Sequence, residues 1–319
     1  MKVLITGGAG FIGSHLAEDY LAKGHEVYVL DNLSTGSQSN LEHITSNSKL
    51  RIIKNTILNY NCLLELVGIC DVVLHLAAAV GVKYIIENPL LSLETNTRGT
   101  EIVLRLCNKF KKKVLIASTS EVYGKNQDIP LKEDKDRLVG PTTTSRWSYA
   151  CSKAFDEFLA LAYHKTTHLP IIIVRLFNTV GPRQTGRYGM VIPRLVQQAL
   201  NGEPMTVYGT GEQTRAFGYV KDVVKAINLL VENSNAVGQV FNIGGQEEIS
   251  ISNLAKRIKK LTNSSSKIQL IPYEEAYEEG FEDMLRRVPD CSKLKDTIGF
   301  HPETSLEVIL KEVIAYYRN

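Results

Sequence analysis

T-G-G-A-G-F-I-G at Thr6–Gly13 decides the fold, because of what stands on either side of it. The apolar run Val3–Ile5 precedes this stretch, and Phe11–Lys23 follows it with helical spacing. A second apolar run, Val27–Leu30, ends at Asp31. A strand, a glycine-rich turn, a helix and a second strand within about 30 residues form a βαβ unit.

The glycines of this turn predict a dinucleotide site. Glycine permits a sharp turn and lets a pyrophosphate approach the backbone at the N-terminus of the helix. An acidic residue at the end of the second strand binds a ribose hydroxyl in such units, which favours NAD over NADP. A purely structural glycine turn, with Asp31 capping the turn before Asn32, is the alternative. The expected cofactor-binding residues of the unit are Gly7, Gly10, Phe11, Ile12, Gly13, Asp31 and Asn32.

Strand and helix patterns then alternate along the chain, which predicts an α/β fold with a Rossmann-type doubly wound parallel sheet. After Asn178, glycines and prolines punctuate shorter segments. We therefore expect an NAD-binding domain over residues 1–178, joined by a strand near 239–243, and a smaller interleaved substrate lobe over 179–319. The expected strands are Leu50–Lys54, Asp71–Leu76, Lys113–Ser118, Pro170–Leu176 and Gln239–Ile243, and the expected helices are Leu91–Phe110, Trp147–His164, Val191–Leu200, Val220–Val231, Ser252–Leu261 and Ser305–Tyr317.

The composition excludes several classes of protein. The 319 residues carry 37 Lys and Arg against 34 Asp and Glu, and this net charge of +3 gives no signal for nucleic acid or a membrane surface. The apolar stretch Val72–Val82 is shorter than the roughly 18 residues of a spanning helix. Five scattered cysteines without a C-x-x-C pair argue against a disulfide framework or a zinc site. We expect a cytoplasmic protein without metal, nucleic-acid or membrane partners.

Tyr149 and Lys153 lie one turn apart on an expected helix, so their side chains share a face. A lysine ammonium favours the phenolate, which brings the tyrosine toward use as a general base at neutral pH. A tyrosine and a lysine at this spacing often occur by chance, but a third sequence element favours a functional pair. The segment Ser118–Gly124 ends a strand at the edge where open α/β sheets bind ligands, and a hydroxyl of Thr119 or Ser120 can hydrogen bond a substrate there.

These elements, in this order, resemble the extended short-chain dehydrogenase/reductase family in its nucleotide-sugar branch. The resemblance covers essentially the whole chain and includes further motifs. They are H-L-A-A at His75–Ala78, Asn96 within T-N-T-R-G-T, R-L-F-N-T-V-G-P-R at Arg175–Arg183 and T-V-Y-G-T-G-E-Q-T-R at Thr206–Arg215. One departure is N-T-I-L at residues 55–58, where relatives place an Asp against adenine.

The resemblance implies tightly bound NAD, a sugar attached to a nucleoside diphosphate, and catalysis by Thr119, Tyr149 and Lys153. It places Asn178 and Arg215 at the diphosphate and Tyr208 near the base. Further implied residues are Leu76, Ala77, Ala78, Asn96, Ser118, Tyr149 and Lys153 at the cofactor, and Arg183, Val191 and Arg287 at the substrate.

Glu121, with Ser120 and Arg287, favours one reaction of the branch. S-T-S-E-V-Y-G at 118–124 and the segments Gly280–Asp283 and Arg287–Asp290 resemble UDP-glucuronate decarboxylases. Oxidation at C4 of glucuronate makes a β-keto acid, which loses CO₂ readily, and return of hydride then gives UDP-xylose unless the 4-keto-pentose is released. By this resemblance Arg287 holds the carboxylate and Glu121 organises proton delivery.

Other functions remain open on the same residues. A UDP-sugar 4-epimerase acting on UDP-glucuronate or UDP-glucose is the main alternative, and Gly181–Gln184 favours it. A dehydratase is disfavoured because Ser120 stands where an Asp is usual, and a non-catalytic NAD-binding regulator is disfavoured because Tyr149 and Lys153 are present. Arg287 pairing with Glu282 or Asp283 is the structural alternative to a catalytic role. The resemblance also implies a homodimer formed through the helices Leu91–Phe110 and Trp147–His164.

Overall fold

The computed structural model describes residues 1–319 apart from 82–84, 86, 187–188, 277–283 and 319. Its centre is a parallel sheet of seven strands in the order β11-β6-β5-β4-β1-β2-β3, which confirms the predicted doubly wound α/β fold. The strands are β1 (Lys2–Thr6), β2 (Glu26–Asp31), β3 (Leu50–Lys54), β4 (Val72–His75), β5 (Lys113–Thr119), β6 (Ile171–Leu176) and β11 (Gln239–Ile243).

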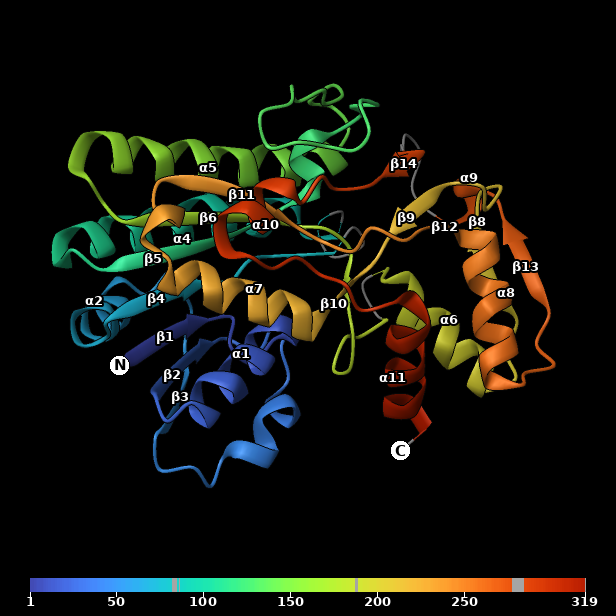
Figure 1. Cartoon of the computed structure of the whole chain (residues 1–319), viewed down its shortest axis with the longest axis horizontal. Helices are drawn as coiled ribbons and strands as arrows, with labels where there is room; N and C mark the ends of the chain where they lie inside the picture. The colour runs from blue at the N-terminus through green and yellow to red at the C-terminus, as the bar shows by residue number, and fades with distance from the viewer. Residues whose placement is uncertain (82–84, 86, 187–188, 277–283, 319) are drawn as a thin grey trace.

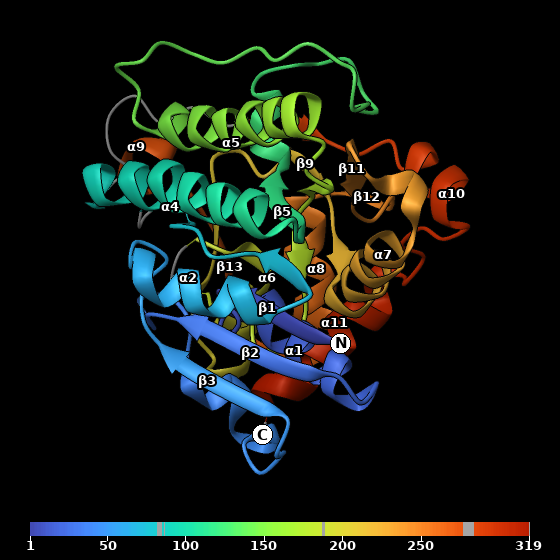
Figure 2. The ribbon, with the colours of Figure 1, turned by 90° about the vertical axis from the view of Figure 1, so that its left-hand side faces the viewer.

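Helices cover both faces of this sheet (Figures 1 and 2). One face carries α1 (Phe11–Ala22), α7 (Val220–Glu232) and α10 (Ser292–Ile298), and the other carries α2 (Tyr60–Ile69), α4 (Pro89–Phe110) and α5 (Arg146–Thr167). Successive side chains of a strand point to opposite faces of the sheet, so alternate apolar residues make each face apolar. Val3 and Ile5 of β1 pack on the side of α1 and α7, whereas Leu4 between them packs on the side of α2 and α4.

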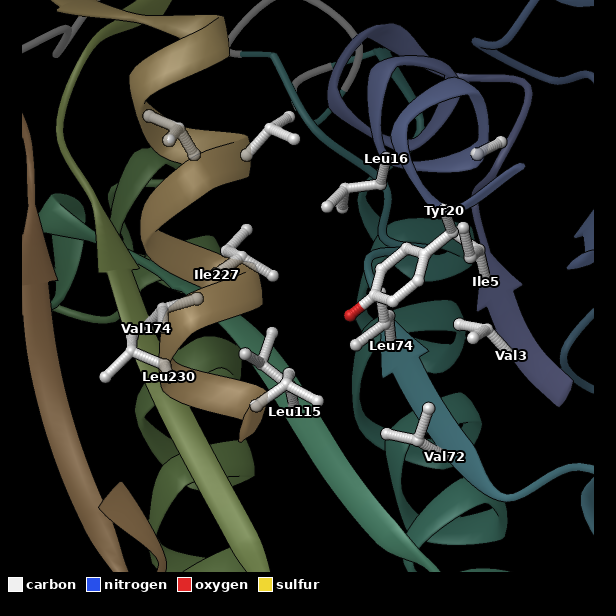
Figure 3. Packing of buried hydrophobic residues seen from close by; sticks show 14 of the residues in the cluster. Val3, Ile5, Leu16, Tyr20, Val72, Leu74, Leu115, Val174, Ile227 and Leu230 are labelled. Atoms are coloured by element: carbon white, nitrogen blue, oxygen red, sulfur yellow. The ribbon is translucent and has the colours of Figure 1, made fainter. Parts of the chain in front are cut away.

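Figure 3 shows the first of these cores at close range. Leu16 and Tyr20 of α1 face Ile227 and Leu230 of α7 across the ends of the central strands. All four side chains are at most 1% exposed. α7 and β11 come late in the sequence, yet both belong to the half of the molecule built on the sheet. β11 is the strand expected near 239–243, whereas α7 lies in the range 179–319 that was expected to form the second lobe.

The remaining elements form a second lobe beside the carboxyl ends of the strands (Figure 1). Its apolar core gathers Ile192 and Leu195 with Leu254, Ile258 and Leu310. The elements of this lobe and its approaches are β7 (Thr179–Val180), α6 (Val191–Leu200), β8 (Met205–Tyr208), β9 (Thr214–Ala216), β10 (Gly218–Tyr219), β12 (Glu248–Ser250), α8 (Ile251–Thr262), β13 (Ile268–Ile271), α9 (Tyr273–Ala276), β14 (Arg286–Arg287) and α11 (Leu306–Arg318). The described residues also form the 3₁₀ helices η1 (Gln38–Ile44), η2 (Ser120–Tyr123) and η3 (Ser234–Ala236).

The expected elements recur with shifts of a few residues at their ends, and three helices were missed: α2, α9 and α10. α2 begins after Asn59, whose side chain accepts a hydrogen bond from Cys62 N at 3.2 Å, a recognisable N-cap. α10 has seven residues, too few for a clear apolar period. Within the described part of the chain, no helix has the length and apolar character required to cross a membrane.

Candidate active site

The glycine turn between β1 and α1 is as tight as its sequence predicts. Gly7 has φ +71°, in the region where residues with a side chain are strained, and its N–H donates to Leu30 O at 2.8 Å. A Cβ on Gly13 would collide with the carbonyl oxygen of Gly7. The turn therefore depends on glycine at both positions.

Asp31 connects this turn to the end of β2. Its carboxylate accepts hydrogen bonds from Ala9 N at 3.0 Å and Leu33 N at 2.8 Å. Burial raises the pKa of Asp31, and these backbone donors oppose that shift. Asp31 thus shapes the loop, as the structural alternative held, and it stands at the strand end where a ribose would lie.

The groups around the turn fit a dinucleotide. Gly10 precedes α1 without a side-chain cap from the described residues, so the first-turn N–H groups at Phe11 and Ile12 face a site suited to a pyrophosphate. The Asn96 amide accepts from Ala79 N at 2.7 Å and donates to Ala79 O at 3.3 Å, which fixes the loop that contains Leu76–Ala78. Asn32 accepts from Ser34 N within its own turn.

Tyr149 and Lys153 come together on α5 beside the end of β5. The Thr119 hydroxyl hydrogen bonds with the Tyr149 phenol. Burial and the negative charge of Glu121 raise the pKa of Tyr149, and the hydrogen bond from Thr119 opposes them. Lys153 donates from Nζ to Asp156 Oδ2 at 2.8 Å, with its side chain 2% exposed. A base next to a buried ammonium is suited to taking a proton from a sugar hydroxyl.

A second group of charged side chains stands against the same tyrosine. Arg287 Nη1 pairs with Glu121 Oε1 at 2.7 Å, and its guanidinium also donates to Ser120 Oγ at 3.4 Å. β14 pairs in parallel with β9, so Arg287 is the direct partner of Arg215. Both arginines are buried, at 6% and 8% exposure. Two buried arginines at paired strand positions, one of them bound to a carboxylate, form a site suited to further anions.

Four other expected residues have protein partners of their own. The Asn178 amide donates to Ala216 O at 2.9 Å, at the start of the second lobe. Tyr208 has the Arg194 guanidinium 3.9 Å from its ring centroid. Arg183 pairs with Glu18 of α1 at 2.6 Å, and Val191 begins α6. The contacts of these residues with a substrate remain predictions.

Sequence reasoning missed the buried polar residues behind the site. Glu157 accepts from Ser118 Oγ and pairs with Arg175 at 2.7 Å, so Ser118, expected at the cofactor, also anchors the end of β5. Asp156 was missed as well, although its position three residues after Lys153 places both on one helical face. The segment Gly280–Asp283, which contributed to the decarboxylase resemblance, lies outside the described residues.

The chain is similar to known enzymes along its whole length. The family model described as GDP-mannose 4,6 dehydratase matches residues 4–313. The UDP-N-acetyl-alpha-D-glucosaminuronate decarboxylase of Bacillus cytotoxicus is 48% identical over 99% of this chain and 98% of its own length. UDP-glucuronic acid decarboxylase 1 of Xenopus tropicalis is 38% identical over 99% of this chain and 72% of its own.

Among solved structures, the UDP-glucuronic acid 4-epimerase of Bacillus cereus, in complex with UDP-glucuronic acid and NAD, matches with a TM-score of 0.90. It is 31% identical, and the match covers 100% of this chain and 99% of that one. Sequence and fold thus agree with the motifs at the glycine turn and on α5. The chain belongs to the nucleotide-sugar branch of the extended short-chain dehydrogenase/reductases, in the family described as GDP-mannose 4,6 dehydratase.

Proposed function

We propose that this protein is an NAD-dependent UDP-hexuronate decarboxylase. The observation that carries the proposal is the Arg287–Glu121 pair beside Tyr149, because it brings a carboxylate-binding cation and a carboxylate to the base that takes the C4 proton. The decarboxylases of Bacillus cytotoxicus and Xenopus tropicalis, at 48% and 38% identity, support it.

The first half of the site serves oxidation at C4. Tyr149 takes the proton of the C4 hydroxyl, Thr119 orients that hydroxyl, and the Lys153 ammonium stabilises the phenolate. NAD⁺ held at Gly7–Gly13 and Asp31 would supply the redox chemistry, accepting hydride from C4 and later returning it. The sugar thereby acquires a ketone two carbons from its C6 carboxylate.

The second half of the site serves loss of that carboxylate. Arg287 pairs with the C6 carboxylate and holds the C5–C6 bond where its electrons can pass into the C4 ketone. Breaking this bond releases CO₂ and leaves an enolate. Glu121, as a carboxylate, orients the water that protonates C5. Arg215, the strand partner of Arg287, would hold the diphosphate.

Incubation with UDP-sugars tests the function directly. UDP-N-acetylglucosaminuronate and UDP-glucuronate are supplied in parallel, with UDP-glucose as the control that has no carboxylate, and products are identified by mass spectrometry and NMR. Loss of CO₂ from either uronate supports the proposal, and the 48% relative favours the 2-acetamido sugar as the better substrate. An isomer of unchanged mass would establish the 4-epimerase instead and overturn the decarboxylase.

We also propose that the protein works as a homodimer through α4 and α5. These helices pack side by side on one face of the molecule (Figures 1 and 2). Leu90 of α4 is 70% exposed and Phe158 of α5 is 66% exposed, with Leu91 and Phe155 exposed as well. Large apolar side chains grouped on adjacent helices are typical of a protein interface. The mass of the protein by light scattering tests this, and a monomer would contradict it.

A further inference from the structure

Asp156 is a buried carboxylate that the reaction outlined above does not use. It lies on α5 three residues after Lys153, with a side chain 0% exposed. Its Oδ2 accepts from Lys153 Nζ at 2.8 Å. Removing two charges from water is costly, and apolar residues in place of a buried pair are often as stable or more so. The pair is therefore weakly explained by stability, and its place beside Tyr149 points to the chemistry.

The charged groups around Lys153 have other partners. Glu157 on α5 is held by Arg175 of β6, and Glu121 on η2 is held by Arg287 of β14. His75 on β4 hydrogen bonds with Thr6 and Thr100, and burial lowers its pKa to about 3, which keeps it neutral. Asp156 is thus the carboxylate paired with Lys153, and its charge acts on Tyr149.

We propose that Asp156 is a positioning residue, which holds the Lys153 ammonium in place and offsets its charge on Tyr149. One of the three ammonium N–H donors is committed to Asp156. The other two remain for the phenol and for the ribose of a bound NAD. A helix that fixes both ends of the Lys153–Asp156 pair keeps this geometry before any ligand enters.

The charge of Asp156 controls how readily Tyr149 releases its proton. The negative carboxylate raises the pKa of Tyr149, and without that charge the phenol proton leaves at lower pH. A redox-neutral reaction requires Tyr149 to take the C4 proton and give it back, which a phenolate stabilised too strongly would do poorly.

The test that needs no substrate is a tyrosinate titration of the full-length protein with NAD. The near-ultraviolet absorbance of tyrosinate is followed against pH, and the signal of Tyr149 is isolated by subtracting the same titration of Tyr149→Phe. In Asp156→Asn, with its own Tyr149→Phe reference, we expect this ionisation to move to lower pH by about one unit. An unchanged ionisation, or one at higher pH, overturns the proposal.

Two further variants keep this test sound. Asp156→Ser removes the charge with less bulk and should give the same displacement if Asp156→Asn does not fold. Glu307→Gln removes a carboxylate from an exposed i,i+4 pair with Lys311 and should leave the titration at wild-type values. If the folded variant has a lower melting temperature but Tyr149 ionises at the wild-type pH, Asp156 is only structural, which also overturns the proposal.

The kinetic test rests on the proposed function. The acid limb of kcat/KM against pH for decarboxylation should move to lower pH in Asp156→Asn and return toward wild type in Asp156→Glu. If the wild-type protein decarboxylates no UDP-uronate, the proposed function fails, and the tyrosinate titration still decides the role of Asp156. A displaced tyrosinate signal supports the role whatever the substrate proves to be.

Discussion

Replacement of Arg287 by glutamine should separate binding of the sugar carboxylate from oxidation at C4. Arg287 is 6% exposed and donates to Glu121 Oε1 at 2.7 Å, so its guanidinium works in a water-poor site. Hydrogen bonds to charged groups contribute about 1.5–3 kcal/mol. Loss of that interaction with the C6 carboxylate therefore predicts a fall in kcat/KM of about 10- to 150-fold.

The assay measures CO₂ release from both UDP-uronates over a range of concentrations, together with absorbance of NADH to follow oxidation. Arg286→Gln is the matched control, because Arg286 is next in the same strand but 57% exposed and paired with Glu248 at 2.8 Å. Exposed pairs contribute little, so the control should keep wild-type turnover. Decarboxylation at the wild-type rate in Arg287→Gln would refute the assigned role of Arg287.

A loss of activity through misfolding must be told apart from a loss of chemistry. Breaking one side of a buried ion pair costs up to about 3–5 kcal/mol, and the partial exposure of Glu121 reduces this. The double variant Glu121→Gln/Arg287→Gln leaves no carboxylate without its cation. It should unfold at higher urea than Arg287→Gln alone, yet remain as inactive. Activity that returns together with stability would show that Arg287 acts through folding.

Three further changes have defined outcomes. Tyr149→Phe removes the proton acceptor, so turnover should fall about 100- to 10,000-fold while calorimetric NAD affinity stays near wild type; equal turnover would exclude Tyr149 as the base. Burial lowers the pKa of His15 to about 4, so the free energy of unfolding should fall as the pH drops from about 6.5 toward 4. In urea unfolding, His15→Gln should reduce the slope of this free energy against pH by about 1.4 kcal/mol per pH unit. An unchanged slope would assign the pH dependence to other groups such as His75. Phe158→Glu should convert a dimer to a monomer in light scattering, whereas Val308→Glu, at an exposed apolar position on α11, should not.

The parts of the fold and site that were predictable are those in which sequence neighbours are also spatial neighbours. Thr6–Gly13 forms its turn from local steric limits, and Tyr149 and Lys153 share a face because one helix contains both. The alternation of strands and helices likewise fixed the sheet, because parallel strands require crossover helices. The strand Gln239–Ile243 was placed in that sheet by its apolar pattern, although it follows much of the second lobe.

The partner of Arg287 could not be found in this way, because its environment is set by strand register. Only the parallel pairing of β14 with β9 brings Arg287 opposite Arg215, and η2 brings Glu121 to Arg287 from more than half the chain away. The nearby acids Glu282 and Asp283, which the sequence offered as partners, lie outside the described residues. A buried guanidinium next to a second one needs an anion fixed by the core, and η2 supplies it at the tip of β5. Tyr149 and Arg287 therefore come together, through Glu121, because a rigid strand end holds them, so the proposed chemistry depends on the sheet as much as on the motifs.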